Sequence, residues 1–371
     1  MKKINIVADS AIPFIDKCLA NVSNVVLTNH SNITNSFLIK NNAEALAVRS
    51  TVKVNRQLLE NTNVKFVATA TSGYDHFDIE YLQNSGIAYF HSPGCNANSV
   101  AEYVIYSFLK WIINNNYELK NINLGIIGFG NIGKLIARYF QSLDINIYIN
   151  DPPLKDDNYI FPDFVQYCEI EDIFENCNVI TNHVPLTKSG KYPTHALISG
   201  KLLNKMKDNT LLIHASRGGV LVESDLLGIM EKKNISAAID VWENEPDFNS
   251  ELTNSSMLAT PHIAGYSYNG KLNGTMQVLK NIENFFGIKP NYDILIKENK
   301  KHRQHKKLLI NNLQEIYKEL NDNRQFEDDF AKMQEASKLN KAGKEAFFQE
   351  IRKNYPKRYE TLNIKKDKLW A

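Results

Sequence analysis

From residue 122 to residue 259, short apolar-rich runs alternate with stretches of helical periodicity. The runs include LGII, IYIN, LLIH and SAAI, and the stretches between them include NIGKLIARYFQSL, SGKLLNKM and VESDLLGIMEKK. Repeated strand–helix–strand units of this kind build a parallel sheet with helices on both faces. The sequence therefore predicts an α/β fold with a doubly wound parallel sheet.

The first strand of this region leads into a glycine pattern, Gly128-x-Gly130-x-x-Gly133, which opens a helix. Gly128 permits a tight turn, Gly130 lets the backbone approach a pyrophosphate, and Gly133 allows close helix packing. The next strand ends at Asp151, near the position of an acid that binds a ribose 2′-hydroxyl. Taken alone, Asp151 is equally well explained as a turn residue before two prolines. With the glycines it favours NAD over NADP, because its charge repels a 2′-phosphate.

Composition limits the class of protein. The chain has 371 residues, enough for two or three domains, and its 43% apolar and 23% charged residues are typical of a soluble globular protein. No run approaches the ~20 apolar residues of a membrane helix, and INIVA near the amino terminus is too short for a signal peptide. The cysteines show no CxxC pair and no metal-ligand spacing: Cys18, Cys95, Cys168, Cys177. We therefore expect free thiols, no metal site and a cytoplasmic location.

The flanking segments carry further elements. The runs INIVA, ALAVRS, KFVATAT and IAYFHS in the first 92 residues predict strands that alternate with short helices. A long helix is predicted over 96–115, where Ser99 as N-cap and Glu102 would form a capping box. A second helix is predicted over 266–287. From about residue 293 the chain is lysine-rich and helical; such a basic tail is most often a solvated surface, and no nucleic-acid motif accompanies it.

Three charged side chains follow predicted strands of the parallel sheet. Arg217 stands in HASRGG, Glu245 in DVWENEP and His262 in TPHIAGY. Oxidation of a 2-hydroxy acid needs a base, a group that tunes the base, and a cation for the carboxylate, and these residue types suit the three roles. Each alone could be a surface ion pair, an acid in a turn or a solvated loop histidine. Together at adjacent strand ends, where open parallel sheets bind ligands, they indicate a catalytic site.

With these motifs in order, roughly residues 2–287 resemble the D-isomer-specific 2-hydroxyacid dehydrogenases, through GFGNIG, HVPLT, ASRGG, DVWENEP and TPHIAG. The resemblance implies that Arg217 binds the substrate carboxylate, that Glu245 tunes the base and that His262 is the acid/base. It also implies a set of residues at the NAD site beside the glycines and Asp151: Thr181, Ala215, Asp240 and Gly265. His214 stands where the family usually has asparagine.

Within that family the chain resembles the erythronate-4-phosphate dehydrogenase branch of vitamin B6 synthesis, through VRSTVKVN, FVATATSGYDHFD, SPGCNANSVAEYV, DPP and PHIAGYSYNGK. This implies substrate contacts from Ser50, Thr71 and Tyr266. It also implies a homodimer with a carboxyl-terminal dimerisation domain at 291–371, for which the closing motif EIRKNYPKRYE is the main support. The NAD-binding domain would span 96–265, and residues 1–95 with 266–290 would form a discontinuous flavodoxin-like substrate domain.

A phosphate on the substrate is expected at the end away from its carboxylate. Arg49 and Lys53 flank Ser50 at the end of a predicted strand, although either could be an ordinary surface cation. The basic run RKNYPKR at 352–358 could contribute charge from a partner subunit. Two other functions stay open at this point: another 2-hydroxyacid dehydrogenase, such as a phosphoglycerate type, and an NAD-binding regulator without turnover.

Overall fold

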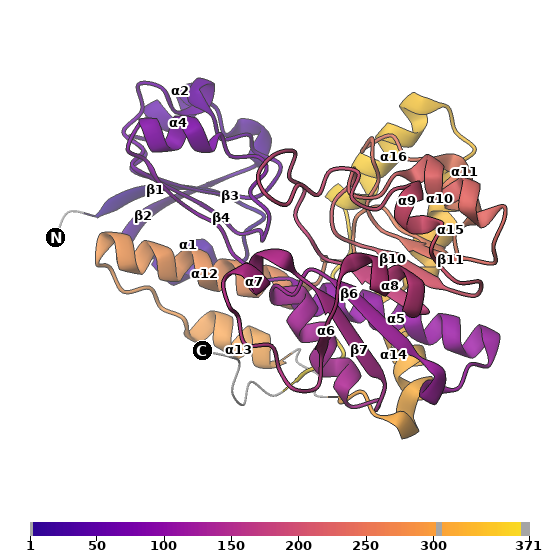
Figure 1. The fold of residues 1–371 in the computed structure, drawn as a ribbon. Coiled ribbons are helices and arrows are strands. Elements are labelled where there is room, and N and C mark those ends of the chain that lie inside the picture. The colour runs from indigo at the N-terminus through magenta and orange to yellow at the C-terminus, as the bar shows by residue number, and fades with distance from the viewer. Residues whose placement is uncertain (1–2, 302–305, 365–371) are drawn as a thin grey trace. The chain divides into compact units, whose positions relative to one another are not determined.

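The computed structural model describes residues 3–301 and 306–364, which form two compact units (Figure 1). One unit comprises Met1–Asn96 and Ser267–Arg303, and the other comprises Ala97–Tyr266 and Gln304–Ala371. The sequence predicted crossings between domains at 95–96 and 265–266, one residue before each of these two boundaries. The predicted carboxyl-terminal domain at 291–371 divides between the two units, because its first residues pack with one unit and the remainder with the other.

The first unit is built on a five-stranded parallel sheet in the flavodoxin-like order β2-β1-β3-β4-β5. Its strands are β1 (Ile4–Asp9), β2 (Ser23–Thr28), β3 (Ala45–Val48), β4 (Phe66–Thr69) and β5 (Ala88–Phe90), and β2 was not among the predicted strands. Its helices are α1 (Ile15–Leu19), α2 (Asn35–Lys40), α3 (Arg56–Leu59), α4 (Ile79–Asn84), α12 (Tyr268–Phe286) and α13 (Asp293–Lys301). Buried residues of α2, α3 and α4 pack on Val7, Leu46 and Val67. Phe286 of α12 packs on Phe66, on the other face of the sheet.

The second unit holds a seven-stranded parallel sheet in the order β12-β11-β10-β9-β6-β7-β8. The strands are β6 (Asn123–Ile127), β7 (Asn146–Asn150), β8 (Gln166–Tyr167), β9 (Val179–Asn182), β10 (Leu211–His214), β11 (Ser236–Ile239) and β12 (Leu258–Ala259). The chain order reverses between β6 and β9, as in Rossmann-type sheets, where a dinucleotide binds at the carboxyl ends of the strands at the reversal. The predicted doubly wound sheet is confirmed.

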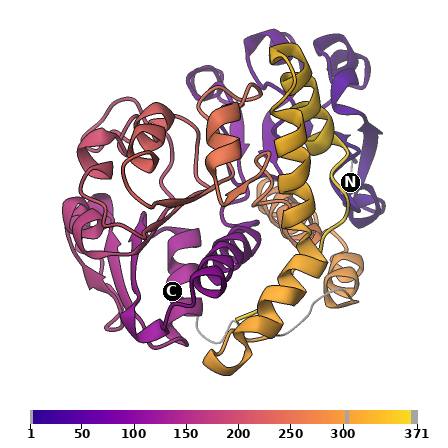
Figure 2. The same cartoon turned by 90° about the vertical axis from the view of Figure 1, so that its right-hand side faces the viewer.

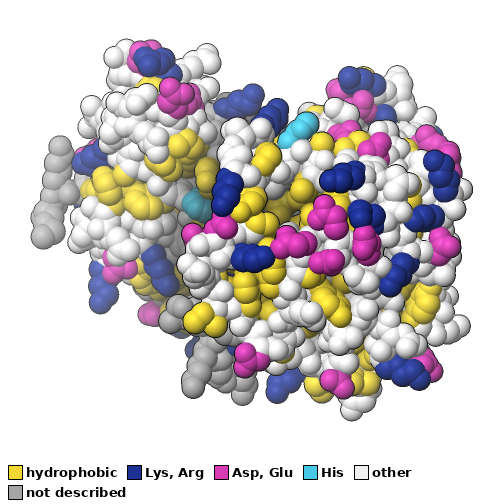
Figure 3. Space-filling model, viewed as in Figure 1, with side chains coloured by type: hydrophobic (Ala, Val, Ile, Leu, Met, Phe, Trp, Pro, Cys, Tyr) yellow, Lys and Arg dark blue, Asp and Glu magenta, His cyan; other side chains and the backbone are white. Residues whose placement is uncertain are grey.

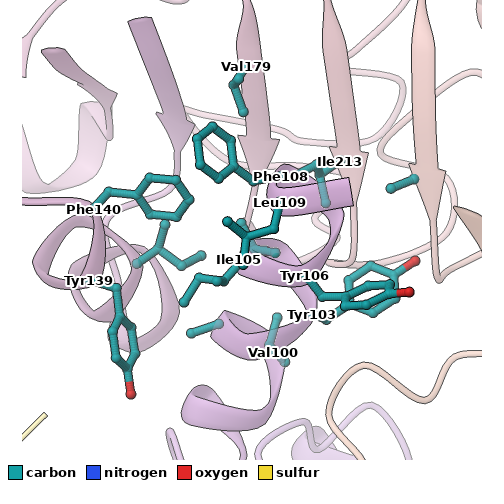
Figure 4. Close-up of a cluster of buried hydrophobic side chains, with 14 of the residues drawn as sticks. Val100, Tyr103, Ile105, Tyr106, Phe108, Leu109, Tyr139, Phe140, Val179 and Ile213 are labelled. Carbon is teal, nitrogen blue, oxygen red and sulfur yellow. The ribbon is translucent and has the colours of Figure 1, made fainter. Parts of the chain in front are cut away.

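Side chains alternate between the two faces of the second unit's sheet, so its core has two parts. Ile126, Val179 and Ile213 belong to the cluster around α5 (Ala97–Asn115) and α6 (Asn131–Gln141), part of which Figure 4 shows. Their sequence neighbours Ile127, Ile180 and Leu212 lie in the opposite cluster, since successive side chains of a strand point to opposite faces. That cluster includes residues of α8 (Ile170–Asn176), α9 (Gly200–Leu203), α10 (Glu223–Met230) and α11 (Ser250–Ser255).

Three helices near the carboxyl terminus complete the second unit (Figure 2): α14 (Leu313–Arg324), α15 (Phe326–Ala336) and α16 (Lys341–Lys353). Helix α14 packs on α5, and α15 packs on β12 and α11. Phe326 is fully buried, and its ring lies 5.3 Å from that of Tyr103 and 5.0 Å from that of Tyr106, both in α5. The carboxyl-terminal segment therefore supplies part of the core of the nucleotide-binding unit.

The helices and one face of the surface were compared with what a membrane span and a nucleic-acid interface require. Among the described residues, none of the helices combines the length and the apolar character that a bilayer span requires. Basic and acidic side chains are interspersed on the face that Figure 3 shows. A nucleic-acid interface usually gathers positive charge on one face, and this view shows no such concentration.

Candidate active site

The glycine loop after β6 has the shape that a pyrophosphate requires. Gly128 has a φ of +89°, and a Cβ there would lie 3.0 Å from the backbone carbonyl carbon of His183. A Cβ on Gly133 would meet the carbonyl oxygen of Gly128 at 2.1 Å, so the close packing of α6 excludes any side chain. At Gly130, the N-cap of α6, a Cβ would meet nothing within 4 Å. The open backbone at the amino end of α6 fits an anionic diphosphate.

Asp151 serves the loop and the following turn at once. Its Oδ2 accepts a hydrogen bond from the amide of Phe129 at 2.7 Å, inside the glycine loop. Its Oδ1 accepts one from the amide of Leu154 at 3.1 Å and caps α7 (Pro152–Asp156). A carboxylate has about four acceptor positions, so these two bonds leave Asp151 able to accept from a ribose. The structure thus contains the turn that the sequence offered as an alternative, without removing the candidate role.

The other candidate cofactor residues lie at the carboxyl ends of neighbouring strands. Thr181 is buried in β9, and its Oγ1 lies 2.9 Å from Nε2 of His183. Ala215 follows β10 and is 7% exposed, and Gly265, after β12, is partly buried. These positions surround the end of the sheet where the glycine loop lies.

Asp240 fastens the loop that carries His262. Its Oδ1 accepts hydrogen bonds from Thr260 Oγ1 at 2.6 Å and from the amide of Ile263 at 2.7 Å. Its Oδ2 accepts one from the amide of Ala264 at 3.0 Å. Burial raises the pKa of Asp240, although His262 and these hydrogen bonds oppose the rise. The carboxylate is therefore a structural clamp for the loop that carries His262, in addition to any contact with a cofactor.

His262 and Glu245 form a close acid/base pair. The Nδ1 atom of His262 lies 2.8 Å from Oε2 and 3.0 Å from Oε1 of Glu245. When Nδ1 donates its hydrogen to the carboxylate, Nε2 is the atom that accepts a proton. Burial pushes the pKa of Glu245 up, but His262, Arg352 and the amide of Trp242 outweigh it and hold the pKa below its ordinary value. Glu245 is therefore ionised and stabilises the imidazolium form of its partner.

The backbone of His262 is held in an uncommon conformation. Its φ of +57° lies in the left-handed region, which few residues other than glycine occupy. Such conformations persist where the surroundings impose them, and they are frequent at active sites. Here the clamp of Asp240 on Ile263 and Ala264 imposes the turn, so that the imidazole meets Glu245.

Arg217 follows β10, so the three candidate catalytic residues follow the adjacent strands β10, β11 and β12. Its Nη1 donates to the carbonyl of Ser216 at 2.9 Å. Behind it, Ser216 Oγ donates to Asn182 Oδ1, and Asn182 Nδ2 donates to Nδ1 of His214 at 2.8 Å. Burial lowers the pKa of His214 to about 3, so this histidine is neutral and accepts at Nδ1. His214, Asn182 and Ser216 thus form a hydrogen-bonded group of buried side chains next to Arg217 in the chain.

The candidate substrate residues fall in both units. In the first unit, Ser50 is exposed after β3, and Thr71 follows β4. Because β3 and β4 are parallel neighbours, both residues lie at one edge of that sheet. Thr71 Oγ1 lies 2.7 Å from Thr69 Oγ1 and donates to the carbonyl of Gly73 at 2.9 Å. Tyr266 belongs to the second unit, with the His262–Glu245 pair.

A buried arginine that the sequence analysis did not single out ties the loop after His262 to α5. Arg324, at the end of α14, has no exposed surface. Its Nη2 donates to Ser99 Oγ at 2.8 Å and to the carbonyls of Ala264 at 3.2 Å and Tyr266 at 3.3 Å, and Nη1 donates to Glu102 Oε2 at 2.7 Å. Ser99 and Glu102 were predicted to form a capping box, and this prediction was wrong. Helix α5 begins at Ala97, and both side chains bind distant parts of the chain.

Glu102 also anchors the carboxyl-terminal segment. Its Oε1 accepts hydrogen bonds from the amides of Thr361 at 2.5 Å and Leu362 at 2.6 Å. Burial raises the pKa of Glu102 to about 7, against the opposing attraction of Arg324. The last described residues, α5 and the catalytic loop therefore share one buried polar cluster.

This chain is similar in sequence and in fold to known dehydrogenases. Residues 109–264 match the family model for the D-isomer specific 2-hydroxyacid dehydrogenase, NAD binding domain. An erythronate-4-phosphate dehydrogenase of Bacteroides thetaiotaomicron is 38% identical, over 78% of this chain and 82% of its own. One from Wigglesworthia glossinidia brevipalpis is 42% identical, over 66% of this chain and 64% of its own. Among solved structures, the NAD⁺-bound 3-phosphoglycerate dehydrogenase of Entamoeba histolytica has a TM-score of 0.64 and 27% identity, covering 77% of this chain and 96% of that one.

The similarity to the Bacteroides thetaiotaomicron enzyme extends across both units. It includes the strand ends that carry Arg217, Glu245 and His262. The solved structure is similar in fold over 77% of this chain, at lower identity. The chain belongs to the erythronate-4-phosphate dehydrogenases, within the D-isomer specific 2-hydroxyacid dehydrogenase family.

Proposed function

We propose that this protein oxidises 4-phospho-D-erythronate at C2 with NAD and forms 3-hydroxy-2-oxo-4-phosphooxybutanoate, a step of pyridoxal 5′-phosphate synthesis. The observation that carries the proposal is the His262–Glu245 pair, with Nδ1 and Oε2 2.8 Å apart, beside the strand that presents Arg217. The family match and the glycine loop support NAD as the cofactor. The four cysteines are free thiols, in keeping with the cytoplasmic location that we propose.

The proposed mechanism gives each proton and charge in the reaction a place. Arg217 binds the substrate carboxylate through its planar guanidinium and fixes the position of C2. His262 Nε2 takes the proton of the C2 hydroxyl as the C–O bond becomes a carbonyl, and Glu245 stabilises the resulting imidazolium. NAD, when bound at the glycine loop, supplies the acceptor for the hydride from C2. Return of the proton from Nε2 to water restores the neutral base.

A direct assay tests the proposed function. NADH formation is followed at 340 nm, the absorbance wavelength of the reduced nicotinamide, with 4-phospho-D-erythronate and with 3-phospho-D-glycerate at matched concentrations. We expect turnover with the first acid and a much lower kcat/KM with the second. Preference for 3-phospho-D-glycerate would assign the protein to a different substrate, and an absence of NADH formation with both would indicate a binding protein without turnover.

Replacement of Asp151 tests the cofactor preference. Asp151→Ala is expected to weaken NAD binding about 10- to 100-fold, because a hydrogen bond to a charged group contributes about 1.5–3 kcal/mol. Binding of NADP should weaken less, since a repulsive charge is removed. Asp151→Asn is the matched control, because it keeps an acceptor for the amide of Phe129 while removing the charge. Fluorescence titration gives the six dissociation constants, for NAD and NADP with the unmodified protein and the two variants. Equal affinity of the unmodified protein for NAD and NADP would contradict the assignment.

Replacement of Glu245 tests the pair through its pH dependence. In the unmodified protein Glu245 is ionised, since its pKa lies below the ordinary value, and it stabilises protonated His262. Glu245→Gln removes this charge, so the imidazolium becomes less stable and loses its proton at lower pH. We expect the acidic limb of the kcat/KM profile for oxidation to move to lower pH, with a reduced maximum. A profile that falls in height without moving would show that Glu245 does not tune the base.

We also propose that the chain forms a homodimer. Leu309, Ile310 and Leu339, on the carboxyl-terminal segment, expose 42%, 54% and 49% of their surfaces, more than such side chains usually expose in water. Sedimentation of the intact chain tests this, and a monomer at micromolar concentration would contradict it. Truncation after residue 293 would not be a clean test, because it removes Arg324 and Phe326 from the core of the second unit.

A further inference from the structure

Helix α16 ends beside the acid/base pair. Arg352, its penultimate residue, places Nη1 3.9 Å from Glu245 Oε2, the oxygen that His262 contacts at 2.8 Å. The guanidinium carbon lies 5.7 Å from the ring centroid of Tyr266 and 5.5 Å from that of Phe348. Arg352 is thus a cation of the carboxyl-terminal segment that lies at the candidate active site within the same chain.

The packing of α16 determines this position. Phe348 is buried, and its ring stacks on that of Phe248 at 6.3 Å. Lys344 Nζ donates to the carbonyl of Phe248 at 2.8 Å and pairs with Asp247 Oδ1 at 2.8 Å. Phe248 and Asp247 belong to the loop that carries Glu245. The helix and that loop are therefore joined by three contacts, which hold Arg352 near Glu245.

The contact between Arg352 and Glu245 is too long to explain by itself why Arg352 lies at this position. At 3.9 Å the two atoms form an ion pair without a hydrogen bond. Glu245 is already satisfied by His262 and by the amide of Trp242 at 3.1 Å. Within the described part of the chain, the buried Nε of Arg352 has no hydrogen-bond partner. A guanidinium has five N–H donors, so Arg352 retains donors for an anion.

We propose that Arg352 binds the phosphate of the substrate and selects phosphorylated over unphosphorylated acids, an inference that rests on the proposed function. Arg217 is assigned to the carboxylate, so a second cation beside His262 suits a second anion on the substrate. The phosphorus of 4-phospho-D-erythronate lies only four bonds from C2, whose hydroxyl faces His262. The planar guanidinium matches a phosphate through two parallel hydrogen bonds. The exposed 26% of the Arg352 side chain leaves it accessible to a ligand.

Binding of phosphate would also change the acid/base pair. At rest, Arg352 and His262 both attract the carboxylate of Glu245, and both hold its pKa down. When Arg352 engages the phosphate, its attraction for Glu245 falls, and the carboxylate acts on His262 alone. The phosphate at one end of the substrate thereby strengthens the base at the other end. An acid without the phosphate leaves Arg352 at Glu245 and reacts with a weaker base.

The test compares Arg352→Gln and Arg352→Lys with Lys353→Gln, a matched control that removes the same charge from the exposed neighbouring residue. For each, kcat and KM are measured with 4-phospho-D-erythronate and with D-erythronate. We expect Arg352→Gln to lower kcat/KM for the phosphorylated acid by at least about 30-fold, mostly through KM. For D-erythronate we expect kcat/KM to rise, by less than about threefold, because Glu245 then acts on His262 alone. The kcat/KM of Arg352→Lys for the phosphorylated acid should lie between those of the unmodified protein and Arg352→Gln, because an ammonium cannot form the two-point contact. Lys353→Gln should behave as the unmodified protein.

Two measurements separate this inference from a defect in folding or in cofactor binding. The dissociation constant for NAD and the melting temperature should be unchanged in Arg352→Gln, and competitive inhibition by inorganic phosphate against 4-phospho-D-erythronate should weaken. Equal losses with both acids, or undiminished inhibition by inorganic phosphate, would overturn the inference while leaving the proposed function intact. If the unmodified protein does not oxidise 4-phospho-D-erythronate, the proposed function fails and this inference fails with it.

Discussion

Replacement of His262 with alanine is expected to lower kcat for 4-phospho-D-erythronate by roughly 10²–10⁴-fold, the usual contribution of a positioned acid/base. Nε2 of His262 is the atom left to take the hydroxyl proton, because Nδ1 faces Glu245. NAD binding should stay within about twofold of the unmodified value, since the glycine loop and Asp151 follow β6 and β7 and not the strand that carries His262. Stopped-flow measurement of NADH formation, with NAD affinity measured in parallel, gives both quantities.

A second variant at position 262 controls for strain in the backbone. A left-handed conformation such as that of His262 costs most residues about 1–2 kcal/mol, whereas asparagine adopts it more readily. His262→Asn therefore removes the base with less strain on the loop than His262→Ala. Similar losses in the two variants would assign the effect to the missing base. Retention of more than a tenth of kcat in His262→Asn would show that another group takes the proton.

Replacement of Arg324 with alanine should have the largest effect on stability. It leaves Glu102 buried without its cation, and breaking a buried pair in this way costs about 3–5 kcal/mol. The loss should be largest at pH 8, above the pKa of about 7 that Glu102 has in the intact pair. Without the cation the folded-state pKa of Glu102 rises further above its unfolded value. A proton then replaces the lost charge as the pH falls, so the destabilisation shrinks toward pH 5.

Urea denaturation at the two pH values measures this difference. The double variant Glu102→Gln with Arg324→Met should recover part of the loss, because glutamine still accepts from the amides of Thr361 and Leu362 and no charge is left unpaired. The catalytic loop supplies a second measure, since Ala264 and Tyr266 lose a donor to their carbonyls. A free energy of unfolding within about 1 kcal/mol of the unmodified protein at pH 8 would contradict the role of Arg324.

The parts of the fold that local sequence determines were predictable. Strand–helix alternation and the glycine spacing around Gly128 depend on neighbours in the chain, and the parallel sheet and loop have the expected form. Strand β2 (Ser23–Thr28) was missed because its exposed positions break the apolar run. The Ser99–Glu102 spacing predicted a capping box, since the same pattern serves that purpose at many helix starts. Its partner Arg324 lies 222 residues from Glu102, a separation at which no local pattern indicates contact.

The candidate site shows the same division between local and distant information. The triad could be proposed because each residue follows a strand whose neighbours are fixed by the parallel order. Arg352 was recognised only as part of a basic run, and a partner subunit was the source considered for its charge. The structure places it beside Glu245 of the same chain. That position depends on the packing of Phe348 against Phe248, which the sequence of either segment alone does not reveal.

The polar cluster around Glu102 has a consequence for synthesis of the protein. Translation adds about 5–20 residues per second, and domains commonly begin to fold as they leave the ribosome. Here the last strand of the sheet that carries His262 ends at residue 259. The loop after that strand accepts a hydrogen bond from Arg324, which comes later in the chain. Glu102 accepts its last two hydrogen bonds from Thr361 and Leu362. A nascent chain with a complete sheet therefore still lacks the donor that Arg324 gives to this loop, although Asp240 already holds Ile263 and Ala264. Completion of the sheet therefore precedes the contacts of Arg324 and Glu102 that finish this buried cluster.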